Sequence, residues 1–390
     1  MERSCSRRIS MKRRELLKFE FLSQTSVGAA EGLAEAFFEV IITRLGASPF
    51  LIGLVGSASY ISNILSPLWA RLSKRTGAKS LVIGSLLLAS IFLATGALFR
   101  NPLIFALFVF LYFIVYGIRE VLYPAIVEKV YGDSSVLGHS EVAFTIAYTI
   151  STLTAGYIMD LWSYRVTFIT AAVLMGIAAL SRLPFPDVRD EEEKTEILEA
   201  VKSDRTLQLM VSLFMVAGTG MLMILPAIPI LEVRHLNLSN TQIGLALAAE
   251  SISHTLFAEL WSRSIKRPSH VIRVFQAGFL AITAMAVLYY LSHSFYPVVL
   301  ASFLCGVGGS AISIGWQVFA MSVPDYRTED LSALHLTTCG IRGLYAPLLG
   351  SAVINSWGVR ADFLVGATLV LLSAFLAEGI KRRIEESFEL

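Results

Sequence analysis

Leu68-Trp69-Ala70-Arg71-Leu72-Ser73-Lys74-Arg75 returns as Leu260-Trp261-Ser262-Arg263-Ser264-Ile265-Lys266-Arg267, about half of the 390-residue chain later. Five of the eight positions are identical, and both copies end an apolar stretch with a group of positive charges. A repeat at half the chain length indicates a protein that is built twice from one design. That duplication constrains the fold more than any single residue does.

The composition is that of a membrane protein. Only 16% of the residues are charged and 55% are hydrophobic, whereas soluble domains carry about 25% charged residues. The apolar residues gather into runs of about 20, the length that a helix needs to cross the hydrocarbon core. Barrel strands are shorter and alternate in polarity, so these runs predict an all-α polytopic membrane protein. The three cysteines lack metal-site spacing, and we expect no metal and no other cofactor.

We predict twelve transmembrane helices, at about residues 20–43, 50–72, 79–99, 102–126, 142–161, 165–183, 207–231, 242–262, 270–291, 296–321, 331–354 and 361–380. The Lys and Arg residues test this topology, because cytoplasmic loops are enriched in them. With the N-terminus in the cytoplasm, 25 of the 32 basic residues fall on that side and five on the other. The pattern predicts a multi-pass protein of the cell membrane with both termini cytoplasmic.

Two further repeats divide the chain into matched halves. Trp162-x-x-Arg165-x-x-Phe168 returns as Trp357-x-x-Arg360-x-x-Phe363, and Leu45-x-x-Ser48-x-x-x-Ile52-Gly53-Leu54 returns as Leu236-x-x-Ser239-x-x-x-Ile243-Gly244-Leu245. Each pair falls between equivalent spans, which predicts two six-helix bundles related by a pseudo-twofold axis along the membrane normal. The expected parts are a basic cytoplasmic segment at 1–19, a bundle at 20–183, a cytoplasmic linker at 184–206, a second bundle at 207–380 and a tail at 381–390. A short surface helix is expected in the linker, from Glu191 to Ser203.

The loop after the second span carries a family motif. Ala70-Arg71-Leu72-Ser73-Lys74-Arg75-Thr76-Gly77-Ala78-Lys79 resembles the Gly-x-x-x-Asp-Arg-x-Gly-Arg-Lys signature of the major facilitator superfamily, with Arg75, Gly77 and Lys79 matching and Lys74 in place of the acid. The resemblance covers nearly the whole chain. It implies a transporter in which helices one, four, seven and ten line a central cavity. It also implies a cytoplasmic gate formed by Arg71, Lys74, Arg75, Gly77, Arg263, Lys266 and Arg267; the alternative is that the basic residues among them only anchor helix ends at the headgroups.

The first span carries a line of polar residues, Glu20, Gln24, Glu31, Glu35 and Glu39. At 100° per residue they form one narrow stripe along a continuous helix. Charges in hydrocarbon mark functional pathways by default, so Glu31 and Glu35 are expected to face the translocation path. The alternative for them is a static ion pair, with Arg119 of the fourth span as the natural partner. Glu20 and Glu39 are expected to be interfacial and solvated.

Other ionisable residues lie inside later spans. Glu120 follows Arg119, and Arg342 lies deep in the eleventh span, where it needs an acidic or carbonyl partner. Glu250 and His254 are four residues apart on one helix face. They predict either a proton relay or, through Glu250 and Arg342, a static pair between two helices. The aromatic and amide residues that could line the cavity are Gln208, Tyr112, Tyr116, Tyr123, Trp316 and Gln317.

Two helices are expected to bend. Pro226 and Pro229 predict a kink in the seventh span, and the run Gly306–Gly309 predicts bending in the tenth.

The combination predicts a secondary transporter that works by alternating access. No ATP-binding loop is present, and span carboxylates outnumber span arginines, which favours proton coupling and a cationic or amphipathic small-molecule substrate, with export preferred. The expected partners are that substrate, protons or another coupling ion, and the lipid bilayer, without nucleic acid and without a second subunit. The alternatives are a membrane-embedded hydrolase that pairs Ser310 with His335 or His254, and a channel.

Overall fold

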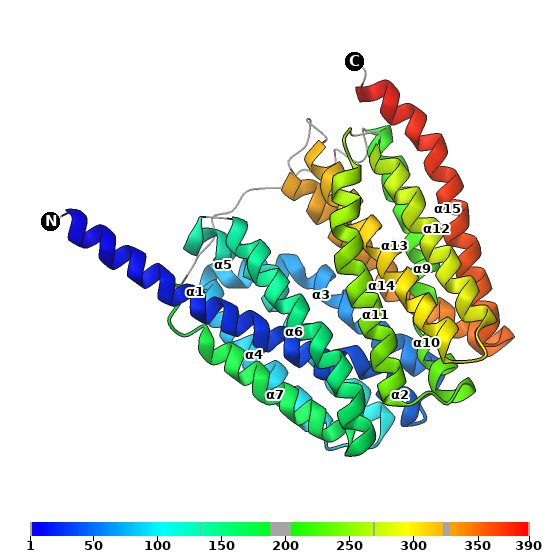
Figure 1. Cartoon of the computed structure of the whole chain (residues 1–390), viewed down its shortest axis with the longest axis horizontal. Coiled ribbons are helices and arrows are strands. Elements are labelled where there is room, and N and C mark those ends of the chain that lie inside the picture. The colour runs from blue at the N-terminus through cyan, green and yellow to red at the C-terminus, as the bar shows by residue number, and fades with distance from the viewer. Residues whose placement is uncertain (1, 133, 188–203, 268–269, 323–327, 389–390) are drawn as a thin grey trace. The chain divides into compact units, whose positions relative to one another are not determined.

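The computed structural model describes residues 2–132, 134–187, 204–267, 270–322 and 328–388, and within them the ordered elements are all helical (Figure 1). The first half contains α1 (Glu2–Leu33), the 3-10 turn η1 (Glu35–Phe37), α2 (Phe38–Arg44), α3 (Pro49–Thr76), α4 (Ala78–Gly96), α5 (Pro102–Tyr131), α6 (Ser134–Leu161) and α7 (Tyr164–Ser181). The second half contains α9 (Arg205–Met223), α10 (Ala227–Ile230), the π-helical turn η2 (Leu231–His235), α11 (Asn240–Ser264), α12 (His270–Leu291), α13 (Phe295–Ser322), α14 (Thr328–Trp357) and α15 (Val359–Phe388). These elements group into twelve helical segments at the predicted places, so the fold class is confirmed. The helix expected at Glu191–Ser203 falls outside the described residues.

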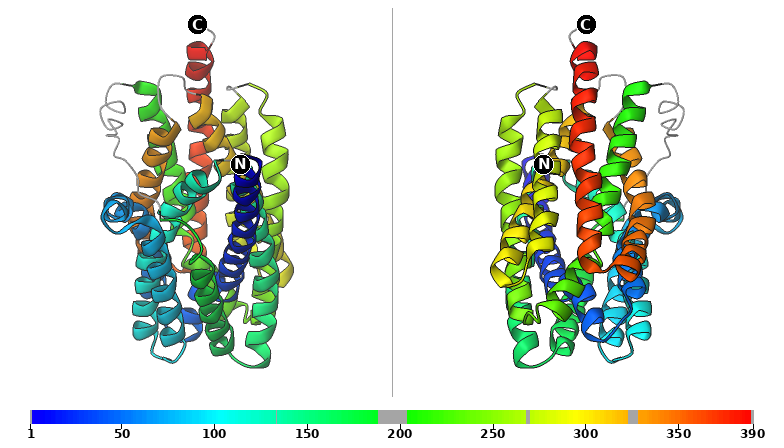
Figure 2. Two further views of the ribbon diagram at one scale, coloured as in Figure 1. Left: turned by 90° about the vertical axis from the view of Figure 1, so that its left-hand side faces the viewer. Right: turned by 90° about the vertical axis from the view of Figure 1, so that its right-hand side faces the viewer.

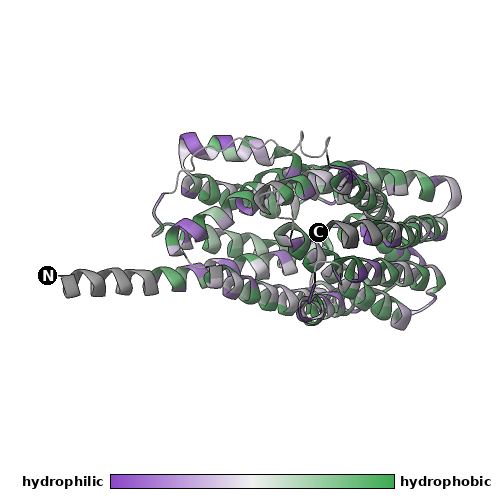
Figure 3. Ribbon diagram, turned by 90° about the horizontal axis from the view of Figure 1, so that it is seen from above, coloured by the Kyte–Doolittle hydropathy of each residue, from purple (hydrophilic) through white to green (hydrophobic). Residues whose placement is uncertain are grey.

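Membrane character is uneven among these segments. Within the described residues, nine helices are long and apolar enough to cross a membrane. Figure 3 shows the hydrophobic residues running along the helices. The long helices that do not meet this criterion are α1, α11 and α14. They carry Glu31, Glu250 and Arg342, respectively. Three candidate site residues thus lie in long helices that fall short of this criterion, whereas Arg119 and Glu120 lie in α5, which meets it.

The chain forms two compact units. Unit 1 comprises Met1–Leu45 and Leu65–Glu192, and unit 2 comprises Gly46–Ile64 and Glu193–Leu390. Helix α3 is thus shared, with its first part clustering with unit 2. Ser57 and Ser351 fix that part against α14: Ser57 Oγ donates to the Leu344 carbonyl at 3.1 Å, and Ser351 Oγ donates to the Pro49 carbonyl at 2.8 Å. Elsewhere in unit 2, α15 runs beside α9 and α12 (Figure 2).

The first membrane helix is not continuous, which corrects the predicted stripe. Helix α1 ends at Leu33, and η1 and α2 follow with a change of direction at Ala34, where φ is −128°. Phe37 and Phe38 are almost completely buried, and the Phe38 ring makes edge contacts with Phe105, Tyr112, Phe113 and Phe168. This aromatic packing accompanies the break, so Glu35 and Glu39 leave the helical phase of Glu31.

The seventh segment breaks as predicted, but the tenth does not. Helix α9 ends at Met223, and Pro226 and Pro229 lie in the turn and the short α10 that follow. Helix α13 runs unbroken through Gly306–Gly309. Its glycines serve packing instead: a Cβ at Gly306 would lie 2.1 Å from the Glu250 carbonyl oxygen of α11, and a Cβ at Gly308 would lie 2.8 Å from the Gly278 carbonyl oxygen of α12.

Gly28 and Gly32 let α1 and α6 approach closely. A Cβ at Gly28 would lie 2.3 Å from the Phe144 carbonyl oxygen, and one at Gly32 would lie 2.4 Å from the Tyr148 carbonyl oxygen. Small residues four apart permit such backbone contact between membrane helices. The α1–α6 contact holds the helix that carries Glu31 in place.

We expect Gly28→Ala to lower the stability of the protein by about 1–3 kcal/mol, the usual cost of overpacking. The obstacle is backbone, which cannot move aside as a flexible side chain would. Gly84→Ala is the matched control, because nothing lies within 4 Å of a Cβ at Gly84 and alanine favours helices by up to about 1 kcal/mol over glycine. Thermal unfolding in lipid nanodiscs checks this, and equal shifts for the two variants would contradict the close-contact account.

Candidate translocation site

A buried polar network joins α1 to α5 inside unit 1. Tyr116 donates a short hydrogen bond to the Glu31 carboxylate, and Arg119 Nη1 donates to the same Tyr116 oxygen at 2.7 Å. Arg119 Nη2 also donates a short bond to the Gln24 side-chain oxygen. Glu31, Gln24, Tyr116 and Arg119 are all buried. The network therefore places a carboxylate and a guanidinium in the helix bundle with one phenol between them.

This arrangement corrects the expected ion pair between α1 and α5. Arg119 makes no direct salt bridge with Glu31 within the described part of the chain; the two groups share Tyr116. A phenol can accept and donate at once, so it can bond both. The Arg119 guanidinium keeps two oxygen partners, Gln24 and Tyr116, that do not depend on the charge of Glu31.

Glu35 belongs to a second, adjoining contact. Tyr112 donates to its carboxylate at 2.8 Å, and the Tyr112 and Tyr116 rings stack with centroids 5.3 Å apart. Two carboxylates thus contact two stacked tyrosines one helical turn apart. Glu120 lies outside this network, because its side chain is exposed.

Sequence reasoning missed a buried ion pair between Arg182 and Glu20, one turn of α1 before Gln24. Arg182 Nη1 and Nη2 contact the two Glu20 oxygens at 2.6 and 2.9 Å, and Arg182 Nε donates to Ser23 Oγ at 2.9 Å. The expectation that Glu20 is solvated is wrong, since its side chain is 0% exposed. Glu39 is only partly buried. Arg182 gave no signal of its own, because it lies at a predicted helix end where basic residues are common.

Unit 2 contains a cavity of about 370 Å³ between α9, α13, α14 and the first part of α3. Trp316 and Gln317, predicted as lining residues, both border it, as does Arg342. Arg342 Nη1 donates to the Phe214 carbonyl at 2.6 Å, and Nη2 lies 2.9 Å from Cys339 Sγ. Among the described residues that line the cavity, Arg342 is thus the one guanidinium or ammonium group in a mostly apolar wall.

The expected pair between Glu250 and Arg342 is wrong. Cys305 Sγ donates to the Glu250 carboxylate at 3.3 Å, whereas Arg342 takes the carbonyl and thiol partners given above. The alternative relay is not assembled here either, since His254 is exposed and makes no hydrogen bond with Glu250. Helices α11 and α13 cross closely at Gly306, and the Glu250 side chain bonds Cys305 of α13.

A further buried acid was also missed. Asp362 of α15 is 0% exposed, and neither of its carboxylate oxygens has a hydrogen-bond partner among the described residues. It lies beside Gly350 of α14, where a Cβ would be 3.2 Å from Asp362 Oδ1. In the sequence it sits at the start of a predicted span, two residues after Arg360, where an acid is unremarkable.

The predicted gate loop of unit 1 has an acid that the family motif did not reveal. Gly77 links α3 and α4 with φ +86°, and the Asp187 carboxylate occupies the place where its Cβ would be. Asp187 Oδ1 accepts from the Lys79 amide at 3.2 Å. Arg71 and Arg75 are exposed and Lys74 is partly buried. The loop has Lys74 where the family motif has an aspartate, and the carboxylate that contacts this loop is that of Asp187, which follows α7.

The repeated loop in unit 2 is more open. Arg263 pairs with Glu259 at 2.7 Å, with both side chains largely exposed, and Lys266 and Arg267 are exposed as well. This half of the repeat makes no contact comparable to that of Asp187 within the described residues.

Twelve helical segments, nine of them long and apolar enough to cross a membrane within the described residues, form two compact units with ionisable side chains inside each. This is the architecture of a membrane transporter. A family model described as Major Facilitator Superfamily matches residues 21–225 and 209–386. The chain belongs to the major facilitator superfamily, as its loop motif predicted. It is a multi-pass secondary transporter and not an enzyme, so the hydrolase and channel alternatives are wrong. Ser310, the serine of the hydrolase alternative, donates from Oγ to the Val307 carbonyl of its own helix at 2.9 Å.

Two relatives are named multidrug resistance protein MdtG. The protein from Citrobacter koseri is 25% identical over 382 residues, covering 92% of this chain and 93% of the relative. The protein from Dickeya zeae is 24% identical over 366 residues, covering 89% and 90%. Solved structures with a similar fold include a mutant of the nucleoside transporter NupG (TM-score 0.76, 15% identity, 95% and 99% covered) and the POT family transporter PepTSo (0.75, 11%, 95% and 98%).

Proposed function

We propose that this protein is a proton-coupled transporter that exports small amphipathic molecules across the cell membrane. One observation carries the proton coupling: the buried Glu31 carboxylate is bonded by the Tyr116 phenol, while Arg119 is satisfied by Gln24 and the same phenol. When an acid in a direct buried ion pair is protonated, the cation beside it loses its compensating charge, which is costly. Glu31 can gain or lose a proton while Arg119 keeps both of its oxygen partners.

The cavity of unit 2 supports an amphipathic substrate. Its volume of about 370 Å³ lies within the range of small-molecule sites. The walls combine aromatic, aliphatic and a few polar residues. The sequence favoured cationic or amphipathic substrates. Amphipathic molecules suit this lining better, because the charged residue among its described members is Arg342, whose positive charge repels a cation. The naming of the 25%-identical relatives as multidrug resistance proteins is consistent with export of such molecules.

Transport in proteoliposomes under an imposed pH gradient tests the proposal. Ethidium and 2-naphthalenesulfonate are suitable probes, because both are amphipathic and neither titrates near neutral pH. We expect saturable, gradient-driven accumulation of at least one of them, abolished when a protonophore collapses the gradient. Accumulation of neither ion, or accumulation that is insensitive to the pH gradient, would contradict the proposal.

A further inference from the structure

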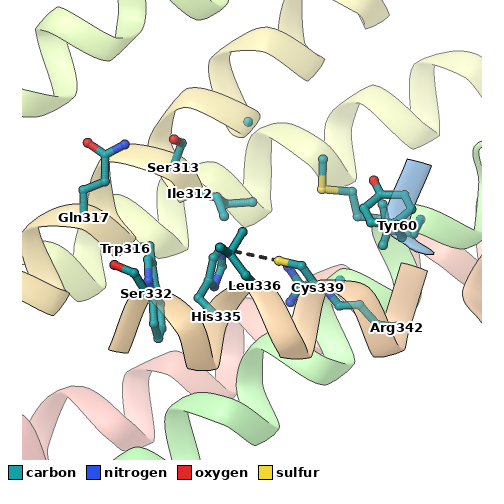
Figure 4. Close-up of a pocket in the computed structure, with 14 residues that line it drawn as sticks. Tyr60, Ile312, Ser313, Trp316, Gln317, Ser332, His335, Leu336, Cys339 and Arg342 are labelled. Atoms are coloured by element: carbon teal, nitrogen blue, oxygen red, sulfur yellow. Dashed lines mark hydrogen bonds between the residues drawn. The ribbon is translucent and has the colours of Figure 1, made fainter. Parts of the chain in front are cut away.

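The cavity of unit 2 has a charged end and an aromatic end. Figure 4 shows Trp316, Gln317 and Ser332 toward one side of the view and Tyr60 and Arg342 toward the other. On α14 the lining residues Ser332, His335, Leu336, Cys339 and Arg342 follow a spacing of three and four residues, so they share one helix face. Seven residues of α14 separate His335 from Arg342, or about 10 Å at 1.5 Å per residue. A molecule of two fused rings with a polar group fits that span.

Arg342 is a buried cation with no carboxylate partner among the described residues. Its side chain is 7% exposed, its oxygen partner is the Phe214 carbonyl, and its other hydrogen bond is to the Cys339 sulfur, a weak acceptor. The guanidinium also lies 6.0 Å from the centre of the Phe214 ring. Its Nε has no hydrogen-bond partner within the described residues. The cavity lining contains no acidic side chain among them either. A guanidinium carries five donors in a planar fork that matches a carboxylate, so an anionic group entering from the cavity would complete its bonding.

The opposite end offers a flat aromatic surface. The Trp316 and His335 rings stack with centroids 4.4 Å apart and planes 19° from parallel. The Phe214 ring meets both of them edge-on, at 5.1 and 5.6 Å. Trp316 Nε1 and His335 Nδ1 are buried and have no partner within the described residues. A planar ring system can therefore pack at this end of the cavity.

We propose that this cavity is the substrate site and that it binds an organic anion with a planar aromatic body, its carboxylate on Arg342 and its rings toward Trp316 and His335. The assignment rests on the proposed transport function and names its substrate class. It replaces the cationic substrate favoured by the carboxylate count with an anionic one. A substrate carboxylate on Arg342 supplies the compensating charge that the described residues of the cavity lining do not.

Equilibrium binding to the full-length protein in nanodiscs tests the charge preference without any gradient. Isothermal titration calorimetry at pH 7 compares 2-naphthoate with 2-naphthamide and 2-naphthylmethylammonium, which keep the rings and change the charge. We expect 2-naphthoate to bind at least about tenfold more tightly than the other two, because hydrogen bonds to charged groups are the stronger ones. Equal affinities, or no binding of 2-naphthoate up to its solubility limit, would overturn the proposal.

A pair of arginine variants assigns the preference to its residue. Arg342→Gln is expected to reduce the preference for naphthoate over naphthamide to less than about twofold. Arg360→Gln is the matched control, because Arg360 bonds the Ser292 carbonyl outside the cavity lining and should leave the preference unchanged. A preference that survives in a folded Arg342→Gln variant would overturn the assignment.

Alkylation of Cys339 locates the site even if Arg342→Gln fails to fold. Cys339 borders the cavity and contacts Arg342, and replacing Cys5 and Cys305 by alanine leaves it as the single thiol of the chain. We expect 2-naphthoate to slow its reaction with N-ethylmaleimide, and 2-naphthamide at the same concentration to have little effect. Identical rates with both ligands would contradict binding at this place. Because neither measurement uses a proton gradient, binding without coupled transport would refute the proposed function and leave this inference standing.

Discussion

Glu31→Gln is expected to reduce pH-gradient-driven transport to the level of empty liposomes while the protein remains folded. Glutamine has the shape of glutamate and can still accept the hydrogen bond from Tyr116, so the α1–α5 contact is preserved. It has no proton to gain or lose. Arg119 keeps its bonds to Gln24 and Tyr116 in the variant. The expected defect is therefore in coupling, not in stability.

The same assay separates Glu31 from the other carboxylates of the first membrane segment. Glu35→Gln is expected to lower driven transport as well, because Glu35 bonds Tyr112, whose ring stacks on Tyr116. Glu39→Gln is the control, since Glu39 is only partly buried and lies on α2 beyond the break. Initial rates, normalised to the amount of reconstituted protein, measure the effect. Unchanged rates in both Glu31→Gln and Glu35→Gln would contradict a proton role for this segment.

Arg182→Met is expected to destabilise the protein by about 3–5 kcal/mol, the cost of leaving one charge of a buried ion pair without its partner. Arg182 and Glu20 are both buried and make two short contacts with each other. The double variant Glu20→Met with Arg182→Met removes both charges and is expected to recover most of that loss, since well-packed apolar residues can replace a buried pair.

An exposed ion pair provides the control for Arg182. Arg263 Nε and Glu259 Oε1 are 2.7 Å apart, but 76% and 63% of the two side-chain surfaces are exposed. Arg263→Met is expected to change stability by less than about 1 kcal/mol. Thermal unfolding in nanodiscs measures all three variants. If the double variant is as unstable as Arg182→Met, the loss comes from packing and the ion-pair account is wrong.

The sequence predicted most of the fold because the hydropathy of the spans and the basic residues of the loops can be read without tertiary contacts. The twelve segments follow from those two signals, and the break in the seventh follows from Pro226 and Pro229. The break after Leu33 has no proline to announce it. It accompanies the packing of Phe38 among rings from α5 and α7, which only the tertiary structure brings together.

The sequence identified several residues of the candidate site, but not which of them contact one another. Glu31, Arg119 and Arg342 stood out because charges are rare in apolar spans. Their pairings did not: Gln24 was expected only in the polar stripe and Tyr116 only in the cavity lining, and the Phe214 carbonyl was not expected at all. These are neutral groups whose roles depend on the tertiary structure. The pairing of Arg342 with Glu250 failed because the Glu250 side chain bonds Cys305 of α13, a contact that leaves no periodic signal in the sequence.

Proton movement driven by substrate tests the central claim, that Glu31 carries the coupling proton, most directly. Proteoliposomes are loaded with the pH indicator pyranine, and the probe that the protein transports, ethidium or 2-naphthalenesulfonate, is added outside without an imposed pH gradient. We predict a saturable change of internal pH with the wild-type protein and none with Glu31→Gln, while exchange of labelled for unlabelled probe continues in both. A substrate-driven pH change that persists in Glu31→Gln would contradict the account.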